Sequence, residues 1–565
     1  MEKLWKASNN SDPNITKTLS QELNVSNIIA ELLIKRDIHT FFEAKNFFRP
    51  KLENLIDPFL MKGMCNATNR INESLKNEEK IMIYGDYDVD GTTSVALLYS
   101  YLMKQKANLI YYIPDRYKEG YGVSVEGIKK AKEEKVSLII IIDCGIKAID
   151  QIELANSFQI DSIICDHHKP GKVLPKAKAI LNPKQDGCNY PYKDLCGCGI
   201  GFKLIQAIEQ QKVQKLDSIL EYLDLVAIAI CADIVPITGE NRLLTFLGLQ
   251  LINKNIRPGL SQLLKTTKKY INVSDLIFTI APRINAAGRM KHGKHAVELL
   301  ICKEENDIFS KARAIELLNT ERKLIDEKIT KEAIEQVETL SEVNNSTTVV
   351  FRPDWHKGVI GIVASRLIDH YYRPTVVLTK SGEVYAGSVR SVKGFDVYEA
   401  LLACSDYMIQ FGGHKYAAGL TIRPSQYSDF KIAFEKEVSN RIESDQTIPS
   451  IIYDIETTLD NFDTTLYRII NQMGPFGPLN RQPLFYIKNC IDNGFTKLVG
   501  AEKNHLSLGI KDETKTNFSG IGFEMGKYIS KIKMNNKFSI LAHLQNNEFR
   551  GESKLQLLIK DISFE

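Results

Sequence analysis

The sequence predicts an α/β protein with a parallel-sheet lobe, a long linker helix, a second α/β lobe and a small C-terminal β-barrel. From Lys80 onward, short apolar runs alternate with amphipathic stretches, as in strand–helix units around a parallel sheet. A charged stretch with helical spacing and few breakers runs from Glu304 to about Leu340. From about Ile451 the chain shows short runs bounded by polar residues and glycine, which is typical of β-barrels.

The composition is typical of a globular protein with several domains. The 565 residues suffice for three or four domains, and 44% apolar with 25% charged residues is ordinary. The net charge of +4 is small, so any nucleic-acid-binding surface has to be a local patch. The N-terminus lacks an export signal and no run of about 18 apolar residues occurs, so we expect a cytoplasmic protein without membrane spans.

The ten cysteines are scattered along the chain, which indicates reduced and buried thiols rather than disulfides. Cys188, Cys196 and Cys198 lie close together, so a zinc site there is an alternative. Their spacing differs from the usual pair of cysteines separated by two residues, which disfavours zinc.

The N-terminal part reads as a helical extension over residues 1–70, with Pro50 and Pro58 as breakers. A first lobe is expected over residues 71–300. Its predicted helices are Thr92–Gln105, Ser124–Glu134 and Ala148–Phe158, and its predicted strands are Ile81–Tyr84, Leu109–Ile113, Leu138–Ile142 and Ser162–Cys165.

Three carboxylates stand within five residues just after the first predicted strand: Asp86, Asp88 and Asp90. Such crowding costs stability at pH 7 unless a cation lies among them, and carboxylate oxygens suit Mg²⁺ and Mn²⁺. A solvated acidic turn is the plain alternative. A calcium-binding EF-hand does not fit, because the position of its bidentate glutamate is the apolar Leu97.

Further candidate ligands follow two other apolar runs. Asp143 follows one run and the triplet Asp166-His167-His168 follows the next. Alone, Asp143 could cap a helix and adjacent histidines are weak evidence. Asp233 lies in an apolar stretch, where an unpaired charge is costly. Because parallel strands bring their carboxyl ends to one edge, these groups together predict a two-cation site that hydrolyses phosphate esters.

A linker helix is expected over residues 301–342 and a second α/β lobe over residues 343–445. Arg390 lies between Ser388 and Gly394 in a stretch punctuated by glycine. Guanidinium groups bind phosphate oxygens in pairs, although a single arginine is more often a plain surface charge. Other segments of this lobe are the predicted strands Thr348–Phe351 and Thr375–Leu378, the predicted helices Val359–Asp369 and Val397–Ile409, and a glycine-rich loop, Phe411–Gly419.

Residues 446–565 are expected to form the barrel. A barrel of this kind would bind single strands with basic groups and with aromatic rings that stack on bases. Four aromatic side chains are candidates for this role, and each is more often a core residue: Phe485, Tyr486, Phe495 and Phe523. The predicted strands include Pro483–Ile487, His505–Ile510, Phe538–His543 and Leu555–Ile559.

These motifs resemble the DHH phosphoesterase superfamily, and the whole chain is similar to its RecJ family of single-stranded-DNA exonucleases. In the second lobe the resemblance rests on WHKGVIGIVASRL (Trp355–Leu367), AGSVRSVKGF (Ala386–Phe395) and FGGHKYAAG (Phe411–Gly419). It implies that the second lobe is a DHHA1 domain and that the barrel is an OB-type domain. In the first lobe it rests on YGDYDVDGT (Tyr84–Thr92), IPDRYKEGYG (Ile113–Gly122), IIDCGI (Ile141–Ile146), DHH (Asp166–His168), GCGIGFKL (Gly197–Leu204), ADIVPITGENR (Ala232–Arg242) and PRINAAGR (Pro282–Arg289).

The resemblance also implies roles for single residues. His168 would face the scissile phosphate, with Asp166 supporting it from behind. The family often has glycine where this chain has Val389, a departure that bears on the fine geometry of the phosphate site. One cation would be held by Asp86, Asp88 and Asp143, and the other by Asp90, Asp143, His167 and Asp233. The 5′ end and phosphates of the substrate would be bound by Arg116, Arg283, Ser388 and Arg390, with Arg289 as a weaker candidate and His414 in a loop over the cleft.

The function that this resemblance implies is a 5′→3′ exonuclease. It would act on single-stranded DNA in repair and recombination and release 5′-mononucleotides with Mn²⁺ or Mg²⁺. A single-stranded-DNA-binding protein and a RecQ-type helicase would be its partners. The alternative is a DHH-type oligoribonuclease or nucleotide phosphodiesterase acting on short substrates, and such chains usually lack the C-terminal barrel.

Overall fold

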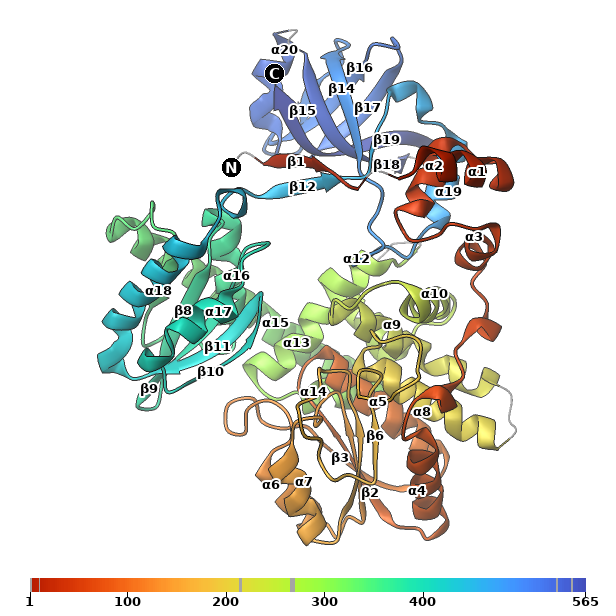
Figure 1. Ribbon diagram of the computed structural model, residues 1–565, viewed down its shortest axis with the longest axis vertical. Helices are drawn as coiled ribbons and strands as arrows, with labels where there is room; N and C mark the ends of the chain where they lie inside the picture. Colours follow the sequence, from red (N-terminus) through yellow and green to blue (C-terminus); the bar gives the residue numbers. More distant parts are fainter. Residues whose placement is uncertain are drawn as a thin grey trace.

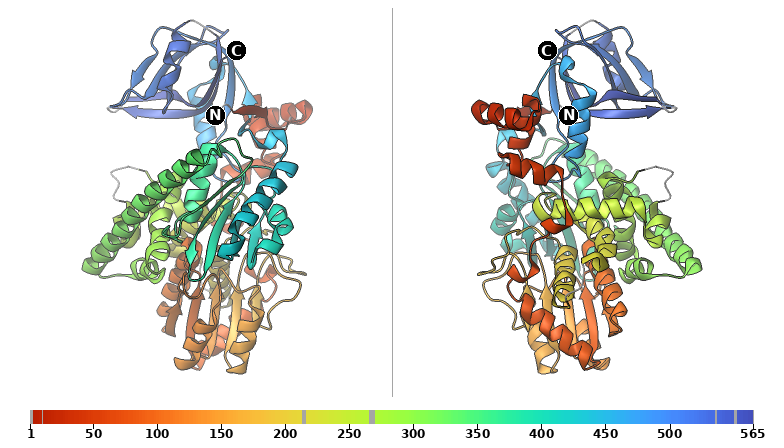
Figure 2. Two further views of the ribbon diagram at one scale, coloured as in Figure 1. Left: turned by 90° about the vertical axis from the view of Figure 1, so that its left-hand side faces the viewer. Right: turned by 90° about the vertical axis from the view of Figure 1, so that its right-hand side faces the viewer.

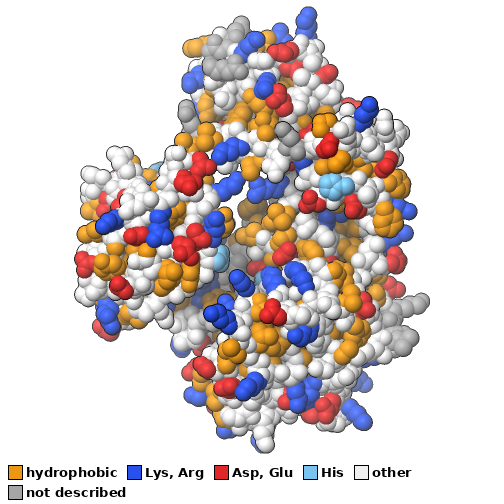
Figure 3. Space-filling view, in the orientation of Figure 1, with side chains coloured by type: hydrophobic (Ala, Val, Ile, Leu, Met, Phe, Trp, Pro, Cys, Tyr) orange, Lys and Arg blue, Asp and Glu red, His pale blue; other side chains and the backbone are white. Residues whose placement is uncertain are grey.

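Three bodies and an N-terminal segment make up the computed structural model, which describes residues 3–9, 11–212, 216–264, 270–534, 537–549 and 552–564. The first lobe lies at the bottom of Figure 1, the second lobe at the left and the barrel at the top. Both chain ends lie at the barrel, as Figure 2 shows from two further sides. In the space-filling view a hollow lies between the three bodies, with Lys and Arg side chains on its rim (Figure 3).

The first lobe contains the expected parallel sheet. Alternate residues of its central strands face two different cores, so the strands are covered on both sides and read as continuous apolar runs. The strand order is β3-β2-β4-β5-β6. The helices are α4 (Met64–Lys76), α5 (Val89–Lys104), α6 (Val125–Glu133) and α7 (Ile149–Ser157), and the strands are β2 (Lys80–Gly85), β3 (Asn108–Tyr112), β4 (Leu138–Ile142), β5 (Asp161–Cys165) and β6 (Ala179–Leu181).

A group of helices completes this lobe and leads into the linker. The linker helix α15 (Glu305–Thr339) agrees with the charged stretch that the sequence marks as helical. Among the described residues, no helix is both long and apolar enough to cross a membrane. The preceding helices are α8 (Gly197–Gln211), α9 (Leu223–Ala232), α10 (Gly239–Lys254), α11 (Pro258–Leu264), α12 (Val273–Asp275), α13 (Ala281–Met290) and α14 (Lys294–Ile301).

The second lobe is built on a mixed sheet of order β10-β11-β9-β8-β7. Two expectations were wrong here. The glycine-rich segment is a β-hairpin of β10 (Gln410–His414) and β11 (Ala417–Ile422), because its backbone pairs with β9 despite the missing side chains. The helix predicted to Ile409 is α17 (Val397–Ala403), which ends earlier. The remaining elements are β7 (Thr348–Phe351), β8 (Thr375–Ser381), β9 (Val384–Arg390), α16 (Ile360–Tyr371) and α18 (Tyr427–Arg441).

The C-terminal domain contains the expected strand-rich barrel, a seven-stranded sheet of order β13-β14-β18-β19-β17-β16-β15. Its two short helices are α19 (Thr464–Gln472) and α20 (Ile529–Lys533). The strands are β13 (Ile455–Glu456), β14 (Phe485–Asp492), β15 (Lys497–Val499), β16 (His505–Lys511), β17 (Asn517–Gly522), β18 (Phe538–Phe549) and β19 (Glu552–Phe564).

The N-terminal segment is helical, as expected, but also contains a strand. Strand β1 (Leu4–Ala7) pairs in parallel with β12 (Ser450–Tyr453), just before the barrel. The helices α1 (Pro13–Leu23), α2 (Asn27–Ile34) and α3 (Phe41–Phe48) follow, and side chains of α1 to α3 join the core of the barrel domain. The segment thus packs on the last domain in the chain as well as on the first.

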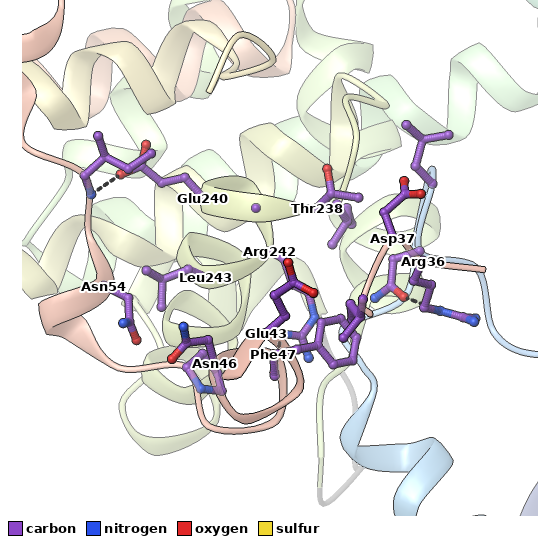
Figure 4. A pocket seen from close by; sticks show the side chains of 17 residues that line it. Arg36, Asp37, Glu43, Asn46, Phe47, Asn54, Thr238, Glu240, Arg242 and Leu243 are labelled. Carbon is purple, nitrogen blue, oxygen red and sulfur yellow. Dashed lines mark hydrogen bonds between the residues drawn. The ribbon is translucent and has the colours of Figure 1, made fainter. Parts of the chain in front are cut away.

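Arg242 at the start of α10 fixes this segment between the domains. Its guanidinium lies 3.7 Å from the ring centroid of Phe47 and donates to the carbonyl oxygens of Phe47 and Gly474, each at 2.7 Å. Figure 4 shows Arg242 beside Phe47 and Glu43 at the edge of a pocket. Because Arg242 is buried, loss of its side chain would leave several carbonyl groups without donors.

Candidate metal centre and phosphate cleft

Acidic side chains of the first lobe meet at the carboxyl edge of its parallel sheet. Asp86 follows β2, Asp143 follows β4 and Asp166 follows β5. In the register of the sheet these three strands end side by side, so the residues that follow them lie together. All three carboxylates are buried.

The turn between β2 and α5 positions the next two carboxylates. Asp88 caps α5 by accepting a hydrogen bond from the N–H of Gly91 at 3.0 Å. Asp90 lies in the first turn and accepts from the N–H groups of Gly197 at 2.6 Å and Cys198 at 2.8 Å. These donors begin α8, whose N-terminus favours negative charge, but burial still raises the pKa of Asp90.

Asp143 is held in a strained backbone conformation, with φ of 64° in the left-handed region that non-glycine residues rarely adopt. A Cβ added at Gly197 would lie 2.6 Å from the Cβ of Asp143, so only glycine permits this close approach of α8. Burial, and then the charges of Asp90, Asp88 and Asp233, raise the pKa of Asp143 well above its ordinary range.

His167 points its Nε2 atom into the carboxylates. This atom lies 3.2 Å from Asp143 Oδ1, 3.6 Å from Asp233 Oδ2 and 3.9 Å from Asp90 Oδ2. Burial lowers the pKa of His167 to about 4, so the ring is neutral at pH 7. Within the described part of the chain, neither His167 Nε2 nor Asp86 Oδ2 has a hydrogen-bond partner, although both atoms are buried.

His168 is oriented by Asp166. Its Nδ1 lies 2.7 Å from Asp166 Oδ1, and the other oxygen of Asp166 accepts from the N–H of Ile146 at 2.9 Å. The Nε2 atom of His168 lies 3.1 Å from the hydroxyl of Tyr121. Burial lowers the pKa of His168, but the bond to Asp166 outweighs it, and the net pKa is raised.

Three arginines gather beside the carboxylates. Burial, and then the charges of Arg116 and Arg390, lower the pKa of Arg289 to about 10. Burial raises the pKa of Asp86 well above its ordinary range, and the charge of Arg116 partly opposes this rise. The charge of Asp88 likewise partly opposes the lowering of the Arg289 pKa, so both arginines lie near the acidic cluster. Such a concentration of guanidinium groups is a site for a polyanion.

The second lobe contributes Arg390 from the end of β9. Arg390 Nη1 donates to Ser388 Oγ at 3.2 Å, and both side chains lie on one face of the strand. Val389 points to the other face and packs in the core, so this departure from the family leaves the Ser-x-Arg face intact. A Cβ at Gly361 would lie 2.9 Å from Ser388 Oγ, so the anion-favouring N-terminus of α16 approaches the same place.

Two sequence-predicted residues lie apart from this group. Arg283 donates to Glu316 on α15 at 2.6 Å and to the carbonyl oxygen of Thr279 at 2.8 Å. His414 is exposed at the end of β10. No interaction among the described residues joins either side chain to the acidic cluster, and Arg289, the weaker candidate, is the one that lies there.

Comparisons with known proteins bear on this arrangement. Family models match the N-terminal domain of the DHH family at residues 80–230, the DHHA1 domain at 344–440 and the RecJ OB domain at 453–561. The single-stranded-DNA-specific exonuclease RecJ of Bacillus subtilis is 38% identical over 97% of this chain and 70% of that protein. The chain belongs to the RecJ family. RecJ of Haemophilus influenzae is 32% identical over 90% of this chain and 92% of its own.

Solved RecJ structures share the fold. RecJ from Thermus thermophilus in complex with Mn²⁺ superposes with a TM-score of 0.86 at 24% identity, covering 100% of this chain and 80% of that one. A structure of exonuclease RecJ bound to manganese is 30% identical, with a TM-score of 0.60, and covers 70% of this chain and 98% of that one. The arrangement of two α/β lobes and a barrel is therefore that of RecJ.

The donor set of the acidic cluster fits divalent cations. Two sets of three residues each bring their ligand atoms within 4.8 Å of one another. One set is Asp143, His167 and His168, and the other is Asp90, His167 and Asp233. Buried carboxylates with raised pKa values and a neutral imidazole with a free nitrogen suit Mn²⁺ or Mg²⁺. None of the candidate groups among the described residues contains a cysteine, so the zinc alternative at Cys188, Cys196 and Cys198 has no support.

Sequence reasoning missed several residues of the cleft. Tyr121 lies in a recognised motif but was given no role, and its hydroxyl faces His168. Gly361 and Gly197 matter because their missing side chains let two helix ends approach the site, and glycine itself carries no such signal in a sequence. Lys184 donates to the carbonyl oxygen of His167 at 2.8 Å and places a positive charge near Asp233.

Proposed function

We propose that this chain is a 5′→3′ exonuclease that degrades single-stranded DNA, releases 5′-mononucleotides and acts in DNA repair and recombination. The supporting observation is that a carboxylate cluster with the donor atoms for divalent cations lies beside three arginines contributed by both lobes. Phosphodiester hydrolysis needs both parts, because the carboxylates alone would repel a polyanion. The names of the RecJ relatives indicate the substrate.

The proposed ligands divide between two cations, Mn²⁺ or Mg²⁺. When bound, the cations activate water and offset charge on the phosphate oxygens in an in-line displacement. A histidine among oxygen ligands favours Mn²⁺ over Mg²⁺. The first ion would bind Asp86, Asp88 and Asp143, and the second would bind Asp90, Asp143, His167 and Asp233.

His168 is proposed to stabilise the scissile phosphate. Asp166 holds the Nδ1 side of the ring, so the Nε2 atom is the one that can offer a proton to the substrate. The raised pKa of His168 increases the fraction that carries this proton near pH 7. Tyr121 restricts the ring from the opposite side and keeps Nε2 in the cleft.

Arg116, Arg289, Ser388 and Arg390 are proposed to bind the phosphates at the 5′ end. They come from both lobes, so a bound strand would join the lobes together. Arg283 and His414 are proposed at the same surface by resemblance. Arg283 would first have to leave its ion pair with Glu316.

The barrel is proposed to bind the strand farther from its end. Phe495 is 80% exposed and Phe523 is 58% exposed, so these rings are available to stack on bases. Phe485 is fully buried in the core. Tyr486 packs against Trp5 and Tyr453. A single-stranded-DNA-binding protein and a RecQ-type helicase are proposed partners, and the cytoplasm is the proposed location.

Nuclease polarity tests this proposal. Strands with a 5′-phosphate, a blocked 5′ end or a blocked 3′ end would be incubated with Mn²⁺, and the products separated by size. We expect mononucleotides from every strand with a free 5′ end. Asp143→Ala should abolish this activity. Cleavage of dinucleotides but not of long strands would instead indicate the short-substrate enzyme.

A further inference from the structure

A groove of about 820 Å³ lies where the N-terminal segment, the first lobe and the barrel domain meet. Its walls come from residues 48–51 at the end of α3, from α10, from residues 270 and 272–274 around the start of α12, and from the end of α19 with the chain that follows it. The N-terminal segment, the first lobe and the barrel domain therefore share this surface. It is separate from the acidic cluster, since no residue of that cluster lines it.

The groove has an unusual chemical character for a protein with 69 acidic residues. Among the residues that the structure describes, no aspartate or glutamate lines it, and Arg49 and Lys51 are its charged side chains. Four aromatic rings line it as well, those of Phe48, Phe246, Tyr270 and Phe476.

A neighbouring pocket of about 480 Å³ provides a contrast (Figure 4). Pro50 lines both pockets. Asp37, Glu43 and Glu240 line the smaller pocket together with Arg36 and Arg242, so among its described lining residues the acidic side chains outnumber the basic ones. Of these two pockets, as far as their described lining residues show, the larger groove is the one that combines positive charge with aromatic rings and lacks carboxylates.

Two of its side chains are available to a ligand. Tyr270 is 62% exposed, and Lys51 is exposed as well. In the described part of the chain, no hydrogen bond or ion pair engages the Tyr270 hydroxyl or the Lys51 ammonium group. Arg49 is partly engaged, since it donates to Gln472 Oε1 at 2.9 Å. An exposed ring beside an unpaired cation matches the two needs of a single nucleic-acid strand, base stacking and charge neutralisation.

We propose that this groove binds single-stranded DNA, namely the part of the substrate strand that lies on the 3′ side of the end held at the cleavage site. This inference rests on the proposed function. The groove joins the barrel domain to the first lobe, so a strand bound there contacts both domains and the N-terminal segment at once. Tyr270 stacks on a base and Lys51 binds a phosphate.

The test measures DNA binding by two single variants and two matched controls. Tyr270→Ala and Lys51→Ala change the groove, whereas Phe42→Ala and Lys45→Ala remove an exposed ring and an exposed lysine of α3 that do not line it. The probe is a 3′-fluorescein-labelled oligothymidine, longer than the roughly 16 nucleotides that an OB fold covers. Fluorescence anisotropy in chelator, where no hydrolysis occurs, gives Kd at several salt concentrations.

Loss of base stacking should raise Kd for Tyr270→Ala by at least about fivefold, and Tyr270→Phe should bind like the wild type. Lys51→Ala should reduce the slope of log K against log salt by about 0.7, the value for one phosphate contact on a single strand. Crosslinking of iodouracil-containing strands, mapped by mass spectrometry, should place Tyr270 at a base.

The outcomes separate this inference from the proposed function. If the wild type neither binds nor degrades single strands, the proposed function fails. If the wild type does both, yet Tyr270→Ala and Lys51→Ala bind like their controls and no crosslink maps to Tyr270, the groove is not a DNA site. Melting curves of all variants verify that a loss of binding is not a loss of folding.

Discussion

Asp233→Asn should stabilise the metal-free protein while it abolishes nuclease activity. Oxygens of Asp233 and Asp90 lie within 4.8 Å of each other, together with His167 Nε2. At that separation two charges repel by about 3.5 kcal/mol at an effective dielectric constant of about 20. Burial, and then Asp90 and Asp88, raise the pKa of Asp233 to about 9. If Asp233 instead takes up a proton when the protein folds at pH 7, linkage puts the cost to folding at about 4 kcal/mol, which is similar to the repulsion energy.

The loss of folding stability that Asp233 causes should increase with pH. The folded pKa lies above the unfolded value of 3.8, so the native state binds more protons than the unfolded state. The penalty is therefore absent below about pH 4 and grows as the pH rises towards about 9. In chelator, the stability of the wild type should decrease as the pH rises through this range, and the stability of Asp233→Asn should decrease less.

Thermal unfolding in chelator and in Mn²⁺ measures the effect. For a domain of this size about 1 kcal/mol shifts Tm by roughly 2–4 °C, so the melting temperature of the first lobe should rise by up to roughly 14 °C in chelator. Mn²⁺ should stabilise the wild type more than the variant, because binding to the native state alone adds stability. Asp150→Asn, at an exposed position of α7, is the control. A Tm of Asp233→Asn at or below that of the wild type in chelator would refute the reasoning.

Four further substitutions test the cleft. Gly197→Ala, whose methyl would lie 2.6 Å from the Cβ of Asp143, should lower Mn²⁺ affinity by about tenfold or more in calorimetry. Tyr121→Phe should lower kcat severalfold with little change in KM, since it removes one hydrogen bond to His168. Arg289→Ala should reduce kcat/KM on 5′-phosphorylated strands by about 10-fold or more, and Arg283→Ala by much less. Equal losses for the two arginine variants would contradict the assignment.

The acidic cluster could be predicted because its information is local. Asp86, Asp143 and Asp166 each directly follow an apolar strand, and parallel strands end at one edge, so these three carboxylates had to meet. The linker helix could likewise be predicted from the spacing of residues within α15. The strain at Asp143 could not, since its φ is imposed by packing around it and not by its own preference.

Features that depend on contacts between distant parts of the sequence could not be predicted from the sequence alone. Strand β1 is four residues long and pairs with β12, which begins only at Ser450, after both lobes. The glycines of the segment that forms β10 and β11 indicate a loop, and only pairing with β9 makes them strands. Arg283 and Arg289 lie on one helix with similar surroundings in sequence, and their different partners, Glu316 and the opposite lobe, decide between them.

The pairing of β1 with β12 has a consequence for how the protein is made. Leu4 lies opposite Ser450, so β1 has no partner during translation until the ribosome has reached β12. The first lobe has all of its strands by Leu181 and can fold long before that point. Until then β1 has an unpaired edge, whose backbone N–H and C=O groups can pair with strands of other chains. A chain that stops before β12 leaves that edge permanently exposed, which makes truncated products prone to aggregation.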